Sequence, residues 1–104
     1  MPRQPVDRMR EALKLIVRRR EWEPVVRNGV IVAVRFPSRS RPDTTWRVDL
    51  DTHACACEDY VNRRGPLGLL CAHGLAVATA TSMRRAGYST AKMITFAEQQ
   101  LAAG

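Results

Sequence analysis

The chain has 104 residues, enough for one small domain with a modest hydrophobic core. Its 17 lysine and arginine residues outnumber its 10 aspartate and glutamate residues, which gives a formal net charge of +7. No apolar run approaches the roughly 18 residues that a membrane span needs, and Met1–Pro5 lacks the charged-then-apolar order of a signal peptide. We therefore expect a single domain over residues 1–104, with no membrane partner.

Arginine rather than lysine supplies almost all of the positive charge. Arginine makes bidentate contacts with phosphate and stacks on bases, so this composition favours a nucleic-acid partner. A GC-rich genome that encodes arginine in excess explains the same composition, and the basic surface is then merely solvated.

The first predicted helix covers residues 6–20. Five apolar side chains fall on one stripe at helical spacing, and we expect them to enter the core: Val6, Met9, Leu13, Ile16 and Val17. Three arginines at 18–20 close this helix, where cations complement the helix dipole. The same three residues are also candidates for contact with phosphate.

A central region over residues 25–86 begins with a predicted antiparallel β-meander. Two apolar runs, 25–27 and 30–34, flank Asn28-Gly29, a dipeptide that favours a type I′ hairpin because both positions accept positive φ. A polar connector at 37–42 follows, and it contains Arg39 and Arg41.

The next predicted strand covers residues 44–50, where Trp46, Val48 and Leu50 alternate with polar residues. Trp46 is a core candidate, with base stacking as the alternative role. A turn then leads into the first two cysteines, so we expect the last strand of the meander to deliver both thiols.

All three cysteines and one of the two histidines occur in two short pairs, Cys55-Ala-Cys57 and Cys71-Ala-His73. Cysteine and histidine at such spacing are typical ligands of tetrahedral zinc, and the intervening loop is long enough to fold the second pair over the first. Four protein ligands leave no open position for water, which predicts one structural Zn²⁺ ion rather than a catalytic one. Thiols kept reduced for zinc indicate a cytoplasmic protein.

Other interpretations of these residues remain open. The cysteines can be buried apolar thiols, or a disulfide pair plus an odd cysteine, although an odd count suits a secreted framework poorly. A nucleophilic Cys71–His73 pair needs a third orienting group, and none stands out. His53 competes for the fourth ligand position, but its place before Cys55 favours a solvated turn. No catalytic constellation is convincing, and we expect no enzyme activity.

Two more helices are predicted after the ligands. One begins at Cys71, where the helix dipole favours a thiolate, and ends near Arg85 with Gly87 as its C-terminal cap. The last helix covers residues 90–102, capped by Ser89 or Thr90. The predicted fold class is therefore α+β, a small antiparallel meander with a zinc-binding loop packed against three helices.

The loop between the ligand pairs ends in three leucines at 67, 69 and 70. We expect one or two of them to be buried, with an exposed partner-binding patch as the alternative.

The ligand spacing resembles that of the SWIM-type zinc finger, C-x-C-x(n)-C-x-H. The likeness extends to an alternating strand before the first cysteine, to Glu58-Asp59-Tyr60 and Arg63-Arg64-Gly65 in the loop, and to an apolar helical run from Gly74. Two features depart from the family pattern: Ala72 stands at an often polar position, and the end of the loop is unusually apolar.

SWIM-type modules occur in Mutator-type transposases, beside helicase-like chromatin ATPases and in recombination-associated factors. The resemblance implies a module that contacts DNA or recruits DNA-processing machinery. Because we expect only a few phosphate contacts, DNA binding should be largely insensitive to sequence. The candidate nucleic-acid contacts are Arg18, Arg19, Arg20, Arg39, Arg41, Arg63 and Arg64. The alternative is an adaptor that docks a larger protein through the apolar loop and last helix, and a thiol redox sensor is a third interpretation.

Overall fold

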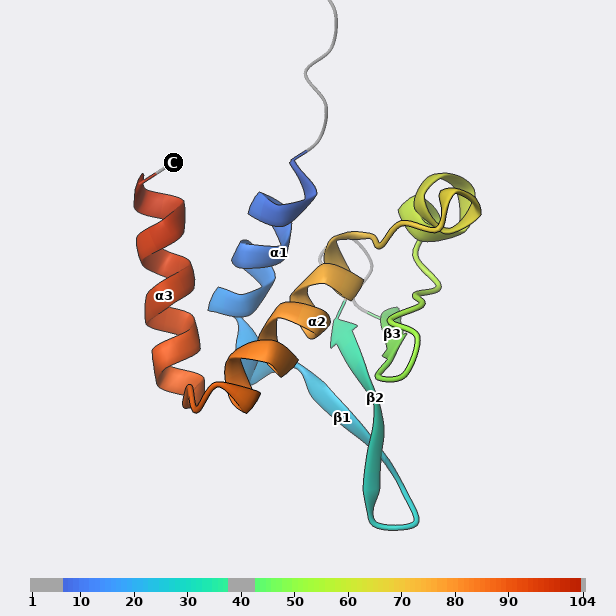
Figure 1. Ribbon diagram of the computed structural model, residues 1–104. Helices are drawn as coiled ribbons and strands as arrows, with labels where there is room; N and C mark the ends of the chain where they lie inside the picture. The colour runs from blue at the N-terminus through green and yellow to red at the C-terminus, as the bar shows by residue number, and fades with distance from the viewer. Residues whose placement is uncertain (1–6, 38–42, 104) are drawn as a thin grey trace, which may run out of the picture.

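The computed structural model describes residues 7–37 and 43–103, and its first element is helix α1, Arg8–Val17 (Figure 1). The Asp7 side chain caps the helix by accepting a hydrogen bond from the Arg10 backbone N–H at 3.0 Å. After α1 the chain tightens into a 3₁₀ turn at Arg19–Glu21. The α-helix is therefore shorter than the predicted 6–20, and Val6, Arg39 and Arg41 lie outside the described residues.

The buried face of α1 is centred on Ala12 and Ile16, which lie one turn apart and are fully buried. This face packs against the second and third helices. Leu13 and Val17 are partly buried against the same core. The prediction for Met9 was wrong: its side chain, in the first turn of α1, is 45 % exposed.

Three strands form an antiparallel sheet in the order β1-β2-β3: β1 is Glu23–Arg27, β2 is Val30–Pro37 and β3 is Thr45–Asp49. The predicted hairpin between the first two is confirmed, with φ of 52° at Asn28 and 78° at Gly29. This hairpin projects away from the helices (Figure 1).

The segment that carries the first two cysteines differs from the prediction. It is not a regular strand, and only an isolated bridge joins Cys55 to Val48 of β3. The chain turns tightly here, with the His53 N–H donating to the Asp49 carbonyl at 2.9 Å and the Asp49 N–H donating to the Ala54 carbonyl at 3.1 Å. These turn contacts use the backbone groups that a longer strand would pair.

The segment between the ligand pairs, called here the ligand loop (residues 58–70), contains a π-helical turn at Tyr60–Arg64 and a 3₁₀ turn at Gly65–Leu67. Helix α2, Ala72–Arg85, follows directly, and helix α3, Thr90–Ala103, completes the chain. Gly87 takes the positive φ expected after a helix, and the Ser89 hydroxyl accepts from the Lys92 N–H at 3.2 Å. These two capping predictions are confirmed.

The core lies between the helices and one face of the sheet. Phe36 of β2 joins the two sides, since its ring lies 4.6 Å from that of Trp22 and it is 1 % exposed. Met93 and Ala97 of α3 extend the same cluster beyond α1. The predicted α+β class, with an antiparallel meander against three helices, is confirmed.

In the described residues, no single helix has the length and apolar character to cross a membrane. The ligand-loop turns Tyr60–Leu67 and helix Ala72–Arg85 meet the test of length and composition only when taken together, across a bend of 59°.

Candidate metal centre

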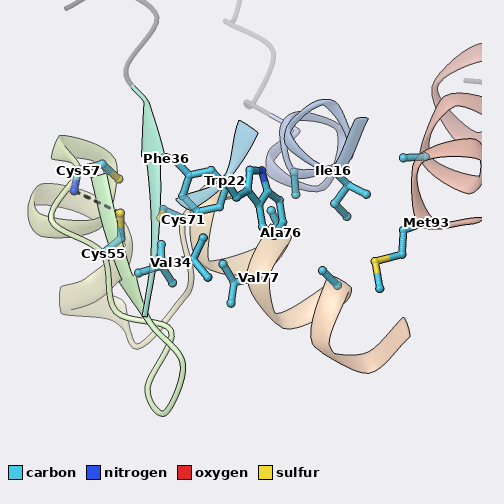
Figure 2. Packing of buried hydrophobic residues seen from close by; sticks show 14 residues of the cluster. Ile16, Trp22, Val34, Phe36, Cys55, Cys57, Cys71, Ala76, Val77 and Met93 are labelled. Carbon is cyan, nitrogen blue, oxygen red and sulfur yellow. Dashed lines mark hydrogen bonds between the residues drawn. The ribbon is translucent and has the colours of Figure 1, made fainter. Parts of the chain in front are cut away.

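The four predicted ligands come from two short backbone segments that lie close together, one just after β3 and one at the start of α2. Cys55 and Cys57 follow the turn after β3, and the Cys57 N–H points to Cys55 Sγ at 3.5 Å (Figure 2). Cys71 is the N-cap of α2, where its Sγ accepts from the Gly74 N–H at 3.5 Å. His73 lies in the first turn of that helix. The helix start therefore orients Cys71 and His73 toward the pair after the sheet.

Ligand atoms of Cys55, Cys57, Cys71 and His73 all lie within 4.8 Å of one another. The three cysteines are at most 6 % exposed, and Nδ1 of His73 lies 3.9 Å from Cys71 Sγ. His53 is not part of this cluster. All three thiols are free, so the disulfide interpretation finds no support.

The donor set fits a zinc ion. Zinc–sulfur bonds of about 2.3 Å in a tetrahedron place sulfur atoms roughly 3.8 Å apart, and ligand atoms that all lie within 4.8 Å of one another accommodate this spacing. Three thiolates and an imidazole are soft and intermediate donors of the kind zinc prefers. The four side chains can therefore hold one ion as its complete first shell.

The pKa values of the candidate ligands shift in opposite directions. Hydrogen bonds from Cys55 and Cys71 hold the pKa of the Cys57 thiol far below its ordinary value. Hydrogen bonds with Cys57 and Cys71, together with burial, raise the pKa of Cys55. Burial alone would lower the pKa of His73, but hydrogen bonds with Cys57 and Cys71 outweigh it and raise the pKa to about 9. Zinc binds the thiolates and the neutral imidazole, so metal binding must release the protons that these groups hold.

A backbone contact between His53 and Gly74 holds the two ligand segments together. His53 adopts a left-handed conformation with φ of 60°, and its carbonyl oxygen would lie only 2.7 Å from a Cβ atom added at Gly74. The start of α2 can therefore approach the turn before Cys55 because residue 74 has no side chain. Sequence reasoning treated His53 only as a rival ligand and missed this role.

A second unpredicted contact joins α1 to the ligand loop. The Arg8 guanidinium donates two hydrogen bonds to the Asp59 carboxylate, at 2.9 and 3.0 Å, and these bonds lower the pKa of Asp59. No local sequence signal indicates the pair, because the two residues are 51 positions apart.

The predicted nucleic-acid contacts fall in different environments. Arg64 donates to the Leu70 carbonyl at 2.7 Å, and Arg19 lies over the Trp22 ring with its centre 4.6 Å from the ring centroid. Both side chains are therefore partly committed to the fold. Arg20 and Arg63 are exposed, and Arg18 forms an exposed ion pair with Glu21 at 3.3 Å.

One cleft lies beside the metal centre, with a volume of about 480 Å³. Its walls come from α1 and the turn after it, the end of β2, the start of β3, the ligand loop and the start of α2. It brings together two predicted contact residues, Arg18 and Arg63, with the predicted ligand His73.

Comparison with models of known families, with curated proteins and with solved structures gave no match. The SWIM-type resemblance therefore stands on the ligand spacing and its flanking residues alone.

Proposed function

We propose that the chain is a non-enzymatic module that binds one structural zinc ion through Cys55, Cys57, Cys71 and His73. The observation that supports this proposal is the convergence of these four side chains from two segments into one buried cluster. Four protein ligands occupy every position of a tetrahedral shell, so substrate and water have no access to the ion. Zinc bound in this way stabilises a small core rather than performing chemistry.

We further propose that the module binds nucleic acid, DNA in the first instance, or recruits DNA-processing machinery in the cytoplasm. The net charge of +7 favours association with a polyanion. Arg20 and Arg63 are exposed and available to phosphate, and Arg18 is held only by an exposed ion pair, which costs little to exchange. The SWIM-type spacing supports the same class of partner.

The test begins with metal content and continues with gel shifts. The purified protein should contain about one zinc ion per chain, and zinc-loaded protein should shift DNA at low salt. On duplex DNA, log affinity should fall by about 0.9 per log unit of salt for each phosphate that the protein neutralises. The Arg20→Ala, Arg63→Ala double variant should weaken binding and flatten this slope, while the exposed Arg27→Ala on the hairpin serves as the control. Folded, zinc-loaded protein that shifts no nucleic acid at low salt would exclude the nucleic-acid proposal.

A protein-interaction adaptor is the second candidate, and one observation favours it. The ligand loop exposes three apolar side chains, Val61 by 56 %, Leu67 by 73 % and Leu69 by 43 %. The expectation that one or two of the three loop leucines are buried is met only in part, by the partly buried Leu70, while Leu67 and Leu69 are exposed. An adaptor would lose its partner in a Leu67→Ser, Leu69→Ser variant that keeps zinc and stability, whereas DNA binding would be unaffected.

A further inference from the structure

The cleft beside the metal centre combines an apolar floor with a charged rim, and of its lining residues only His73 is a proposed metal ligand. We call it the aromatic cleft, defined by Trp22, Phe36, Trp46 and His73 on its floor and by Lys14, Arg18 and Arg63 on its rim. Its volume of about 480 Å³ falls within the range of small-ligand pockets, roughly 300–1,000 Å³.

The floor is a set of packed rings. The Phe36 ring centroid lies 4.6 Å from that of Trp22 and 5.2 Å from that of His73. Trp46 faces Phe36 across the β2–β3 pair and is only half-buried. Because Trp22 and Phe36 are almost fully buried, Trp46 is the ring best placed to stack on a ligand.

One ring nitrogen of His73 is committed to the metal cluster, since Nδ1 lies 3.9 Å from Cys71 Sγ. Metal-binding histidines use their second ring nitrogen to donate to an outside acceptor. His73 also lines the cleft, and by this rule the ring nitrogen that does not bind the metal is a candidate donor to a ligand bound there.

The rim holds its cations in weak pairs. Lys14 lies 3.0 Å from Glu11, Arg18 lies 3.3 Å from Glu21, and Arg63 lies 3.8 Å from Asp59. The Lys14 and Arg18 pairs are exposed and add little stability, so phosphate can replace Glu11 and Glu21. Asp59 is partly buried and held by Arg8, but the Arg63 side chain is 73 % exposed and can reach a phosphate. The rim carboxylates still repel a continuous phosphate backbone. A bound polyanion must therefore gain part of its affinity from contacts with the aromatic floor of the cleft.

We propose that the aromatic cleft binds one base of a single-stranded nucleic acid, with the base stacked on Trp46 and the adjoining phosphate held by Lys14, Arg18 or Arg63. This inference rests on the proposed nucleic-acid function and narrows it to single strands. In a duplex each base already stacks on its neighbours, so it cannot enter the cleft without being unpaired. Stacking on aromatic side chains accepts every base, in keeping with binding that is largely insensitive to sequence.

The fluorescence of Trp22 and Trp46, the only two tryptophans, provides the test in the zinc-loaded full chain. An oligothymidylate of about 12 nucleotides should quench it and bind more tightly than a duplex of equal length. Inorganic polyphosphate of equal charge should compete poorly, because it has no base. Thymidine monophosphate should bind much more weakly than the strand.

Variants assign the binding to the cleft. Trp46→Ala should weaken strand binding by roughly 5- to 150-fold, the loss typical of one stacked base, while Trp46→Phe should retain most of it. Lys14→Glu changes an exposed rim residue without touching the core and should also weaken binding. Arg27→Ala and Val30→Ala, both exposed on the hairpin, should leave it unchanged. Zinc content and melting temperature establish that each variant is folded.

Different failures separate the two proposals. Tighter binding to duplex than to single strand, equal competition by polyphosphate, or equal affinity for thymidine monophosphate would overturn the cleft proposal and leave nucleic-acid binding intact. Wild-type affinity in folded Lys14→Glu and Trp46→Ala variants would likewise overturn the cleft proposal and leave nucleic-acid binding intact. Absence of binding to either form of DNA at low salt would overturn both.

Discussion

Replacing Gly74 with alanine tests the contact that brings the two ligand pairs together. The new Cβ atom would lie 2.7 Å from the His53 carbonyl oxygen and 3.4 Å from Leu70 Cβ. The oxygen belongs to a backbone held at φ of 60° by a 2.9 Å hydrogen bond from the His53 N–H to the Asp49 carbonyl. Relief of the clash therefore requires a shift of α2 or of the turn that leads to Cys55.

Two opposing effects set the expected magnitude. Alanine in a helix interior is more favourable than glycine by about 0.8–1 kcal/mol. Overpacking of a well-packed site typically costs about 1–3 kcal/mol, and a contact with backbone lies at the upper end because the neighbour cannot rotate away. We expect a net loss of about 1–2 kcal/mol, or a fall in melting temperature of about 4–8 °C for each kcal/mol.

The assay is urea or thermal unfolding of the zinc-loaded protein followed by circular dichroism, with zinc affinity measured against a competing chelator. Gly74→Ala should lower both stability and zinc affinity, because the shift separates the ligand pairs. Ser82→Ala, at an exposed position of the same helix, is the matched control and should be neutral or slightly stabilising. A Gly74→Ala protein more stable than wild type, with unchanged zinc affinity, would refute the close approach of His53 to α2.

Three other perturbations give direct expectations. His73→Ala should release zinc or weaken its binding strongly, whereas His53→Ala should keep the zinc content of wild type; elemental analysis decides between them. Zinc binding at pH 7 should release at least two protons, one from the Cys55 thiol and one from the His73 imidazolium, whose pKa values are raised. Zinc affinity should therefore rise with pH through about 9, the pKa of His73, and keep rising above it because the pKa of Cys55 is raised above its ordinary value. Calorimetry in buffers of different ionisation enthalpy would measure the proton release, and a pH-independent affinity would contradict this expectation. Phe36→Ala should cost about 3–5 kcal/mol of unfolding free energy, against little change for the exposed Val30→Ala, and equal losses would mean that Phe36 is not a core residue.

The local elements of the fold could be predicted from sequence because each depends on neighbouring residues. Asn28-Gly29 accepts the positive φ of a two-residue turn, so it defines the β1–β2 hairpin independently of the residues that the hairpin contacts in the fold. Ser89 and Gly87 act on backbone groups within a few positions. The four candidate ligands were also visible, because metal coordination requires particular side chains at short spacing.

The burial of individual side chains was predicted less well. Helical periodicity placed Met9 on the apolar stripe, but the Met9 side chain is exposed, and periodicity cannot show which part of a helix face a neighbouring element covers. Leu67 and Leu69 are apolar and yet exposed, because the turns of the ligand loop direct them outward. Burial depends on two surfaces, that of the element and that of the neighbour which covers it. A periodic pattern describes only the surface of the element itself.

The amino-acid sequence by itself determined the α+β class, the three main helices, the three strands up to Asp49, the hairpin turn and the set of candidate metal ligands. The tertiary structure alone decided that Arg8 reaches Asp59, that the His53 carbonyl lies against Gly74, and that Trp46 shares a cleft with His73. Capping, turn formation and ligand spacing act over a few residues, where the chain's own geometry limits the outcomes. Contacts between distant residues follow only once the core has packed, because packing sets which distant backbones and side chains meet.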